Sequence, residues 1–145
     1  MAITLRQAND IILAAFAEAT ERGLPPIAVA VLDPGGHLKA MQRQDGLSFL
    51  RAEICQAKAW GALALGTDTR KLADRFAGDT QQQGFIQALN AMSGGRIVPL
   101  PGGILIHDAN GTIVGAVGVA GAPSDLDEAC AQAGVLAAGL KVVDD

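Results

Sequence analysis

The sequence predicts an α+β fold in which helices flank an antiparallel β-sheet. Two pairs of strand-like segments are each joined by a tight, glycine-containing turn, and tight turns connect antiparallel neighbours. Other segments carry apolar residues at helical spacing, so each helix can pack one face against the sheet. The chain has 145 residues, and we expect a single domain over 1–145.

The first half of the chain predicts a helix, a hairpin and a second helix. Thr4 followed by Gln7 is a capping-box pattern, and Gly23 ends the apolar periodicity that begins there. The hairpin turns at Pro-Gly-Gly, and its first strand is continuously apolar. The expected elements are a helix over 5–23, strands over 27–33 and 37–43, and a helix over 48–66.

The second half predicts shorter helices, three strands and a last helix. Asn110-Gly111 is the strongest short-range turn signal in the chain. Acidic residues from Asp125 onward favour a helix start, where the helix dipole stabilises negative charge. The expected elements are a helix over 67–76, a polar loop over 78–85, helical turns over 85–92, a short strand within 93–103, hairpin strands within 104–119, and a helix over 125–139.

Composition limits the classes of function. The net charge of −4 and the pI near 5.0 argue against nucleic acid as a partner. No secretory leader is visible, and no apolar run approaches the roughly 20 residues that span a bilayer, so we expect a cytoplasmic protein without membrane contact. Half of the residues are hydrophobic but only 3% are aromatic. This surplus of small apolar residues predicts a homo-oligomer.

Few residues suggest metal or redox chemistry. Cys55 and Cys130 lie far apart within predicted helices, which is typical of reduced core thiols. His37 and His107 lack cysteine or carboxylate partners at ligand spacing, so no metal site is predicted. His107 is interpreted either as a hydrogen-bonded histidine at a strand end or as a haem or metal ligand. Trp60 is expected in the core more than over a cofactor.

Arg43, Asp45 and Lys58 are the polar residues with the clearest functional interpretations. Arg43 and Asp45 lie on one side of an extended chain, as a surface ion pair or as an anion clamp that holds a carboxylate. Lys58 interrupts an apolar helix, so it either extends to the surface or faces a cleft. In a cleft, desolvation would lower its pKa and suit it to anion binding or imine chemistry.

The stretch "PLPGGILIHDANGTIVGAVGVAG" (99–121) is rich in glycine although it reads as strands. Glycine weakens a strand and marks places where another backbone or a ligand comes close. Gly115 and Gly118 are three residues apart and so face opposite sides of a strand. We expect a ligand at one of them and a packed helix or a neighbouring subunit at the other.

Several segments together resemble the GlcG/HbpS family, which includes the C-terminal domain of PduO-type proteins. The segments are "AVLDPGGHLKAMQRQDG", "QAKAWGALALG", the glycine-rich stretch above and "DLDEACAQAG", in the family's order along nearly the whole chain. The resemblance implies a profilin-like fold with a five-stranded antiparallel sheet, and it implies oligomers. Some members bind haem. The positions that match the family pattern are Asp33, Arg43, Asp45, Gly46, Lys58, Pro101, Gly102, Gly103, Gly115 and Gly118.

The resemblance leads to a first functional hypothesis, an oligomeric protein that binds haem or another small carboxylate-bearing molecule. The backbone of Pro101, Gly102 and Gly103 is expected to offer N–H groups to a small anionic ligand in a pocket that Arg43 and Lys58 also face. The complete set of expected ligand-binding residues is Arg43, Asp45, Lys58, Pro101, Gly102, Gly103 and His107.

Two further hypotheses stay open at this point. One is an enzyme that acts on a small organic acid, with Arg43 holding the carboxylate and Lys58 or Asp45 transferring a proton. The other is a purely structural role in which oligomer formation is the function.

Overall fold

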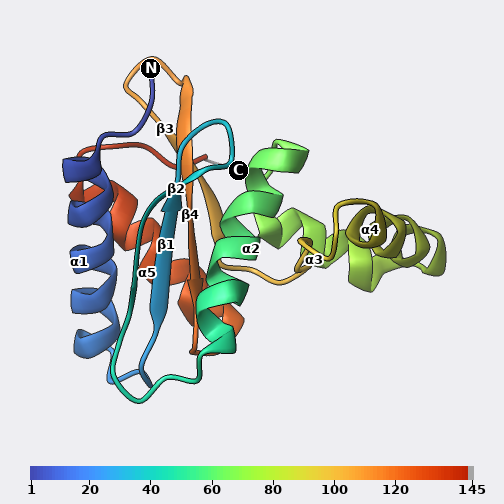
Figure 1. Ribbon diagram of the computed structural model, residues 1–145, viewed down its shortest axis with the longest axis horizontal. Helices are drawn as coiled ribbons and strands as arrows, with labels where there is room; N and C mark the ends of the chain where they lie inside the picture. Colours follow the sequence, from blue (N-terminus) through green and yellow to red (C-terminus); the bar gives the residue numbers. More distant parts are fainter. Residues whose placement is uncertain (144–145) are drawn as a thin grey trace.

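The structure, a computed structural model, describes residues 1–143. It has four strands and five helices in that range, and it confirms the α+β class (Figure 1). In chain order the elements are α1 (Leu5–Glu21), β1 (Ala28–Leu32), β2 (Leu38–Arg43), α2 (Leu50–Leu65), α3 (Thr69–Gly78), α4 (Thr80–Met92), β3 (Gly103–His107), β4 (Ile113–Ala120) and α5 (Ser124–Ala137).

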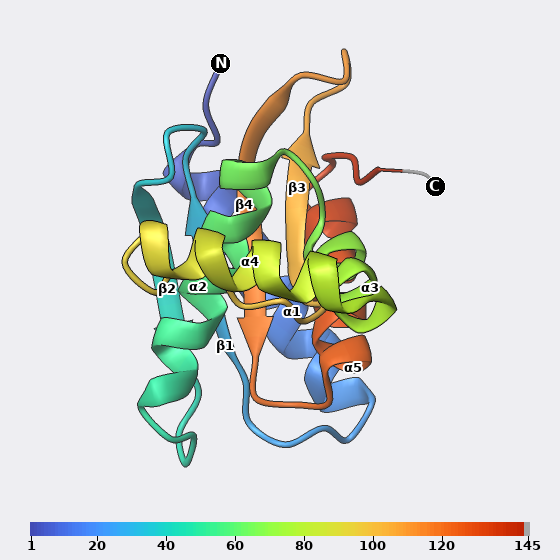
Figure 2. The same cartoon turned by 90° about the vertical axis from the view of Figure 1, so that its right-hand side faces the viewer.

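The sheet separates two helical layers. Its order is β2-β1-β4-β3 with every neighbouring pair antiparallel. Helices α1 and α5 cover one face, α2 covers the other, and α3 with α4 extends beyond α2 (Figures 1 and 2). The central strand β1 is buried along its whole length, whereas β2 is an edge strand that stays mostly exposed. The largest core cluster lies between the sheet and the α1–α5 pair.

The predicted start of α1 is confirmed in detail. The Gln7 N–H donates to Thr4 Oγ1 at 3.1 Å, and the Thr4 N–H donates to Gln7 Oε1 at 3.0 Å. This reciprocal pair satisfies two backbone donors that a helix start leaves free. The buried side chains of α1 then recur at helical spacing and face α5 and the sheet.

The sheet has four strands within residues 1–143, so the expectation of five is wrong. The missing strand is the one predicted within 93–103. Pro99 and Pro101 lack the N–H that a strand ladder needs. The Ile97 N–H donates instead to the side chain of Asn90 at 2.9 Å, and the Leu100 N–H donates to the Val98 carbonyl. The segment up to Pro101 therefore has no strand partner among residues 1–143.

The predicted polar loop over 78–85 is also wrong, because α4 already begins at Thr80. Asp79 lies at the helix N-cap, where its carboxylate accepts a hydrogen bond from the Gln82 N–H at 2.7 Å. Such a cap stabilises a helix start even when the following residues are polar. The Asp79 cap thus explains why the glutamine-rich stretch is helical and not a loop.

Candidate functional site

Lys58 lies in the middle of α2 and reaches across the end of the sheet. Its side chain is 2% exposed. Its Nζ donates to the carbonyl oxygen of Val119 at 2.9 Å and to the carboxylate of Asp127 at 3.2 Å. The second carboxylate oxygen of Asp127 accepts from the Ala122 N–H at 3.0 Å. The pair therefore links α2 and α5, which lie on opposite faces of the sheet.

Burial dominates the protonation of this pair. It lowers the pKa of Lys58 and raises the pKa of Asp127, and the attraction between the two groups opposes both shifts. A lysine with a lowered pKa suits imine or proton-transfer chemistry. Here, however, Nζ is held by two oxygen acceptors inside the core. A substrate would reach it only after that contact opened.

Asp127 is the important partner that sequence reasoning missed. The sequence assigned it to the acidic start of a helix, together with its neighbour Asp125. A usable signal was present, because a lysine in an apolar helix needs a buried counter-charge unless it reaches solvent. Asp127 lies three and four residues before the apolar Cys130 and Ala131, so helical spacing places it on their buried face of the helix.

Pro101, Gly102 and Gly103 are buried at the start of β3, next to α2. A Cβ atom on Gly103 would overlap the carbonyl oxygen of Lys58, and one on Gly102 would lie 3.0 Å from Lys58 Nζ. The Gly103 N–H donates to Thr69 Oγ1 at 2.8 Å. These glycines therefore admit the backbone of α2 and the Lys58 side chain, and the Gly103 donor already has a protein acceptor.

The glycines of β4 also mark close backbone approaches. A Cβ atom on Gly118 would overlap the carbonyl oxygen of Cys55 in α2, and Gly118 is paired with Gly103 across the sheet. A Cβ atom on Gly115 would meet the carbonyl oxygen of Leu32 and the side chain of Ile3. The two β4 glycines thus make room for a packed helix on one side and for protein main chain and the N-terminal segment on the other.

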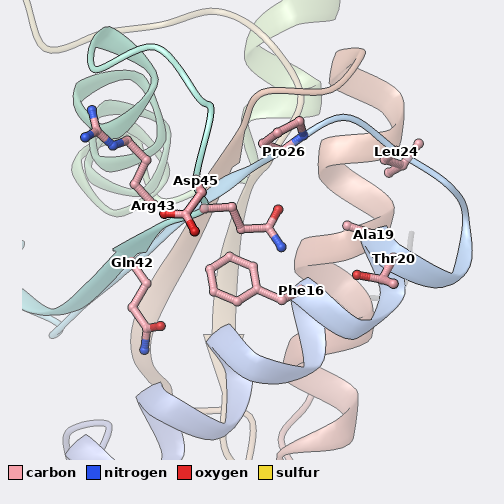
Figure 3. Close-up of a pocket in the computed structure, with 9 residues that line it drawn as sticks. Phe16, Ala19, Thr20, Leu24, Pro26, Gln42, Arg43 and Asp45 are labelled. Carbon is pink, nitrogen blue, oxygen red and sulfur yellow. The ribbon is translucent and has the colours of Figure 1, made fainter.

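A groove opens between the end of α1 and the end of β2, with a volume of about 490 Å³ (Figure 3). We call it the Arg43 groove. The ring of Phe16 lies at its centre, whereas the side chain of Arg43 points away from that ring, toward the side of the sheet that α2 covers. Its lining consists of Phe16, Ala19, Thr20, Leu24, Pro26, Gln42, Arg43, Gln44 and Asp45.

The groove brings together two of the predicted site residues, Arg43 and Asp45. Both are exposed. Within residues 1–143 they form no ion pair with each other, and the Arg43 guanidinium forms no side-chain hydrogen bond there. Lys58 is not part of this lining. The structure therefore leaves an unpaired cation on the edge strand beside the groove, separate from the buried lysine.

His107 lies at the opposite corner of the sheet from Arg43. Arg43 pairs with Ala28, which pairs with Ala120 at the end of β4, whereas His107 pairs with Ile113 at its start. The two residues are on opposite edge strands, about 14 Å apart across the sheet and about 23 Å apart along it. One small ligand in a single chain cannot contact both.

The His107 side chain has one notable feature. Its Nδ1 is buried and has no hydrogen-bond partner within the described residues. The backbone of His107 pairs with that of Lys141 in both directions at 2.9 Å, which fixes the residue beside the C-terminal segment. A buried nitrogen without a partner is unfavourable. Since it is covered by protein, it can reach a metal or haem iron only if its surroundings move.

None of the helices within residues 1–143 combines the length and the apolar character needed to cross a lipid bilayer. No group of three or more histidine, cysteine or acidic side chains in that range is arranged to hold a metal ion.

The two cysteines are predicted to be chemically inert in the folded protein. Burial raises the pKa of Cys55 to about 12 and that of Cys130 to about 11, so almost no thiolate exists at pH 8. We expect neither thiol to react with Ellman's reagent at pH 8 until guanidinium chloride unfolds the chain, after which both react. Rapid labelling of either thiol in the native protein would contradict this expectation.

The four-stranded sheet between two helical layers, the close packing of α2 on the strand glycines and the groove together define a small α+β protein. The sequence model of the haem degrading protein HbpS-like family matches residues 3–136. The chain belongs to this family, as the resemblance predicted. It is 34% identical over 119 residues to Protein GlcG of Escherichia coli, which covers 81% of each chain.

Solved structures agree with this assignment. A double mutant of HbpS from Streptomyces reticuli is 33% identical and superposes with a TM-score of 0.76, covering 94% of this chain and 86% of that one. The structure of a PduOC:haem complex superposes with a TM-score of 0.85 at 23% identity, covering 99% and 100%. The second likeness shows a shared fold.

Proposed function

We propose that the protein binds a small carboxylate-bearing molecule in the Arg43 groove, with haem as the first candidate. The observation that carries the proposal is a groove with an aromatic centre whose edge strand carries the exposed, unpaired Arg43 side chain, which in the structure points away from the Phe16 ring. Arginine presents a planar fork that matches a carboxylate, and an apolar floor takes the rest of a ligand. Membership of an HbpS-like family and the haem complex of PduOC support haem as the first molecule to test.

The groove has side chains that suit the carboxylates and the apolar edge of haem, but none that usually ligates its iron. Phe16, Leu24 and Pro26 offer apolar surface, and the unpaired Arg43 side chain would turn around the edge strand to reach a propionate. The groove lining contains no histidine, cysteine, methionine or tyrosine, the side chains that usually ligate haem iron. Haem held in this groove would therefore depend on Arg43 and on apolar contact.

The proposal also covers location, domain number and oligomeric state. We propose a cytoplasmic, single-domain homo-oligomer, as the sequence predicts. The exposed fractions of Phe49 and Met92, 79% each, support an assembly because large apolar side chains are normally covered.

Haemin titration followed at the Soret band tests this function. We expect a saturable shift in the wild-type protein and a dissociation constant raised about tenfold by Arg43→Gln, which removes the charge and keeps a polar side chain. Haemin dimethyl ester, which lacks free carboxylates, should bind the wild-type protein as weakly as haemin binds that variant. Arg6→Gln, an exposed arginine outside the groove, is the matched control and should change nothing.

The titration also distinguishes haem binding through Arg43 from haem binding through His107. His107→Ala should leave the Soret shift unchanged, because His107 lies at the far corner of the sheet. Loss of the shift in His107→Ala, with Arg43→Gln unaffected, would contradict the groove and place the iron near β3. Absence of any saturable shift would exclude haem and leave smaller carboxylates as the ligand class.

A further inference from the structure

A second cavity, of about 300 Å³, lies on the other side of the sheet from the Arg43 groove. It is bounded by α2, by the turn between β1 and β2, and by the chain that follows α4. We call it the Trp60 cavity. Its lining is Gly36, Glu53, Gln56, Ala57, Trp60, Gly95 and Arg96. None of these residues belongs to the predicted site.

Arg96 is stacked on Trp60 at the wall of this cavity. The guanidinium carbon lies 3.9 Å from the centroid of the indole ring. The Nε of Arg96 donates to the Ser93 carbonyl at 2.8 Å, which uses one of its donors and fixes the plane of the group. Within residues 1–143 the two terminal nitrogens of Arg96 make no hydrogen bond or ion pair. A positioned planar cation with a free fork is suited to a carboxylate.

The chain that carries Arg96 is itself held in place. Asn90 accepts the Ile97 N–H on its side chain at 2.9 Å and the Gly95 N–H on its backbone carbonyl at 2.7 Å. Ile97 is buried against α3 and α4. Arg96 is therefore anchored on both sides of the chain, so binding a ligand there requires little ordering of the main chain.

Trp60 contributes a second donor. Its indole N–H makes no hydrogen bond within the described residues, and its Nε1 is not among their fully buried unsatisfied atoms, so it is accessible. Gly36 keeps this edge of the ring open. A Cβ atom on Gly36 would lie 3.2 Å from both Cδ1 and Nε1 of the indole. The cavity thus holds one free N–H donor beside one free guanidinium.

The remaining lining limits the charge of a ligand. Ala57 supplies apolar surface and Gln56 an amide, while Glu53 adds a negative charge at the exposed rim. A carboxylate at the rim repels a second negative charge and tolerates a neutral hydroxyl. The lining therefore favours a monoanion with a further oxygen atom over a dianion.

We propose that the Trp60 cavity binds a small organic monocarboxylate that carries a second oxygen acceptor. Its carboxylate receives two hydrogen bonds from the terminal nitrogens of Arg96, and its second oxygen accepts the Trp60 indole N–H. This site is independent of the Arg43 groove, because the two cavities share no residue and lie on opposite faces of the sheet.

Tryptophan fluorescence tests the proposal directly. Trp60 is the only tryptophan and the chain contains no tyrosine, so the emission reports on this cavity alone. The probe is lactate, with lactamide as the uncharged isostere, malonate as the dianion, and sodium chloride at matched ionic strength. We expect a saturable change with lactate at millimolar concentrations or below, and none with the other three.

Variants then assign the contacts. Arg96→Lys keeps the charge but loses the planar fork, and we expect the lactate dissociation constant to rise at least tenfold. Trp60→Phe keeps an aromatic ring and removes the donor, and calorimetry should show severalfold weaker binding. Arg75→Lys is the matched control, since Arg75 lies 5.8 Å from the Phe85 ring outside the cavity.

The proposal fails if lactate gives no saturable change in the wild-type protein, or if Arg96→Lys binds lactate as well as the wild type does. It also fails if Arg43→Gln abolishes the lactate response, because the ligand would then occupy the Arg43 groove. Conversely, a lactate response without any haemin binding would support this cavity while haem failed as the ligand of the Arg43 groove. Unchanged circular dichroism of each variant shows that the fold is retained.

Discussion

Asp127→Ala is expected to lower the free energy of unfolding by about 3–5 kcal/mol, because it leaves the Lys58 ammonium buried without a counter-charge. Lys58 is 2% exposed, and among residues 1–143 its only other acceptor is the Val119 carbonyl. The replacement also removes the acceptor of the Ala122 N–H. Urea unfolding followed by circular dichroism measures the change.

Two further variants show whether the effect belongs to the buried pair. Asp125 lies on the same helix as Asp127 and forms an exposed ion pair with Arg70 of α3, so Asp125→Ala should change the free energy of unfolding by less than about 1 kcal/mol. The double replacement Lys58→Met with Asp127→Leu removes both charges and should recover most of the loss. If Asp127→Ala were no more destabilising than Asp125→Ala, the pair would not hold α2 to α5.

Gly118→Ala is expected to destabilise the fold by about 3 kcal/mol or more, at the upper end of overpacking effects. The added methyl group would overlap the carbonyl oxygen of Cys55 and lie 2.8 Å from the backbone nitrogen of Ala59. Backbone atoms cannot rotate away as a side chain can. The whole of α2 would have to move off the sheet, and thermal unfolding should report the change as a much lower midpoint.

Gly84→Ala is the matched control for this prediction. Gly84 lies within α4, and apart from its own helix a Cβ atom there would meet no atom of residues 1–143 within 4 Å. Alanine should therefore stabilise the helix by about 0.5–1 kcal/mol. If Gly118→Ala were tolerated as well as Gly84→Ala, the close approach of α2 to β4 would be incorrect.

The same packing makes Gly103 unsuitable for testing a ligand contact by mutation. If Gly103 only lined a ligand pocket, Gly103→Val would abolish binding and leave the fold intact. In the structure a side chain on Gly103 overlaps the Lys58 carbonyl. That variant would disturb α2 itself, so loss of binding would not identify a ligand contact. Arg43→Gln is the better probe because its side chain is exposed.

Local signals predicted most of the secondary structure. The Thr4–Gln7 capping box and the Asn110-Gly111 turn depend on neighbouring residues only, and both are confirmed. The fifth strand failed because a strand needs a partner with free donors, and the proline-containing segment offers few. Helix α4 was missed over 80–84 because glutamines are polar in a loop and in an exposed helix alike, and only the Asp79 cap distinguishes the two.

The sequence by itself determined the family, the α+β class and the choice of Arg43 and Asp45 as neighbouring groups, since these depend on order along the chain and on short spacings. Only the tertiary structure decided which distant groups meet. It paired Lys58 with Asp127, separated His107 from Arg43, and brought Arg96 to Trp60. These contacts depend on the packing of helices and strands against one another, and a single sequence does not record that packing.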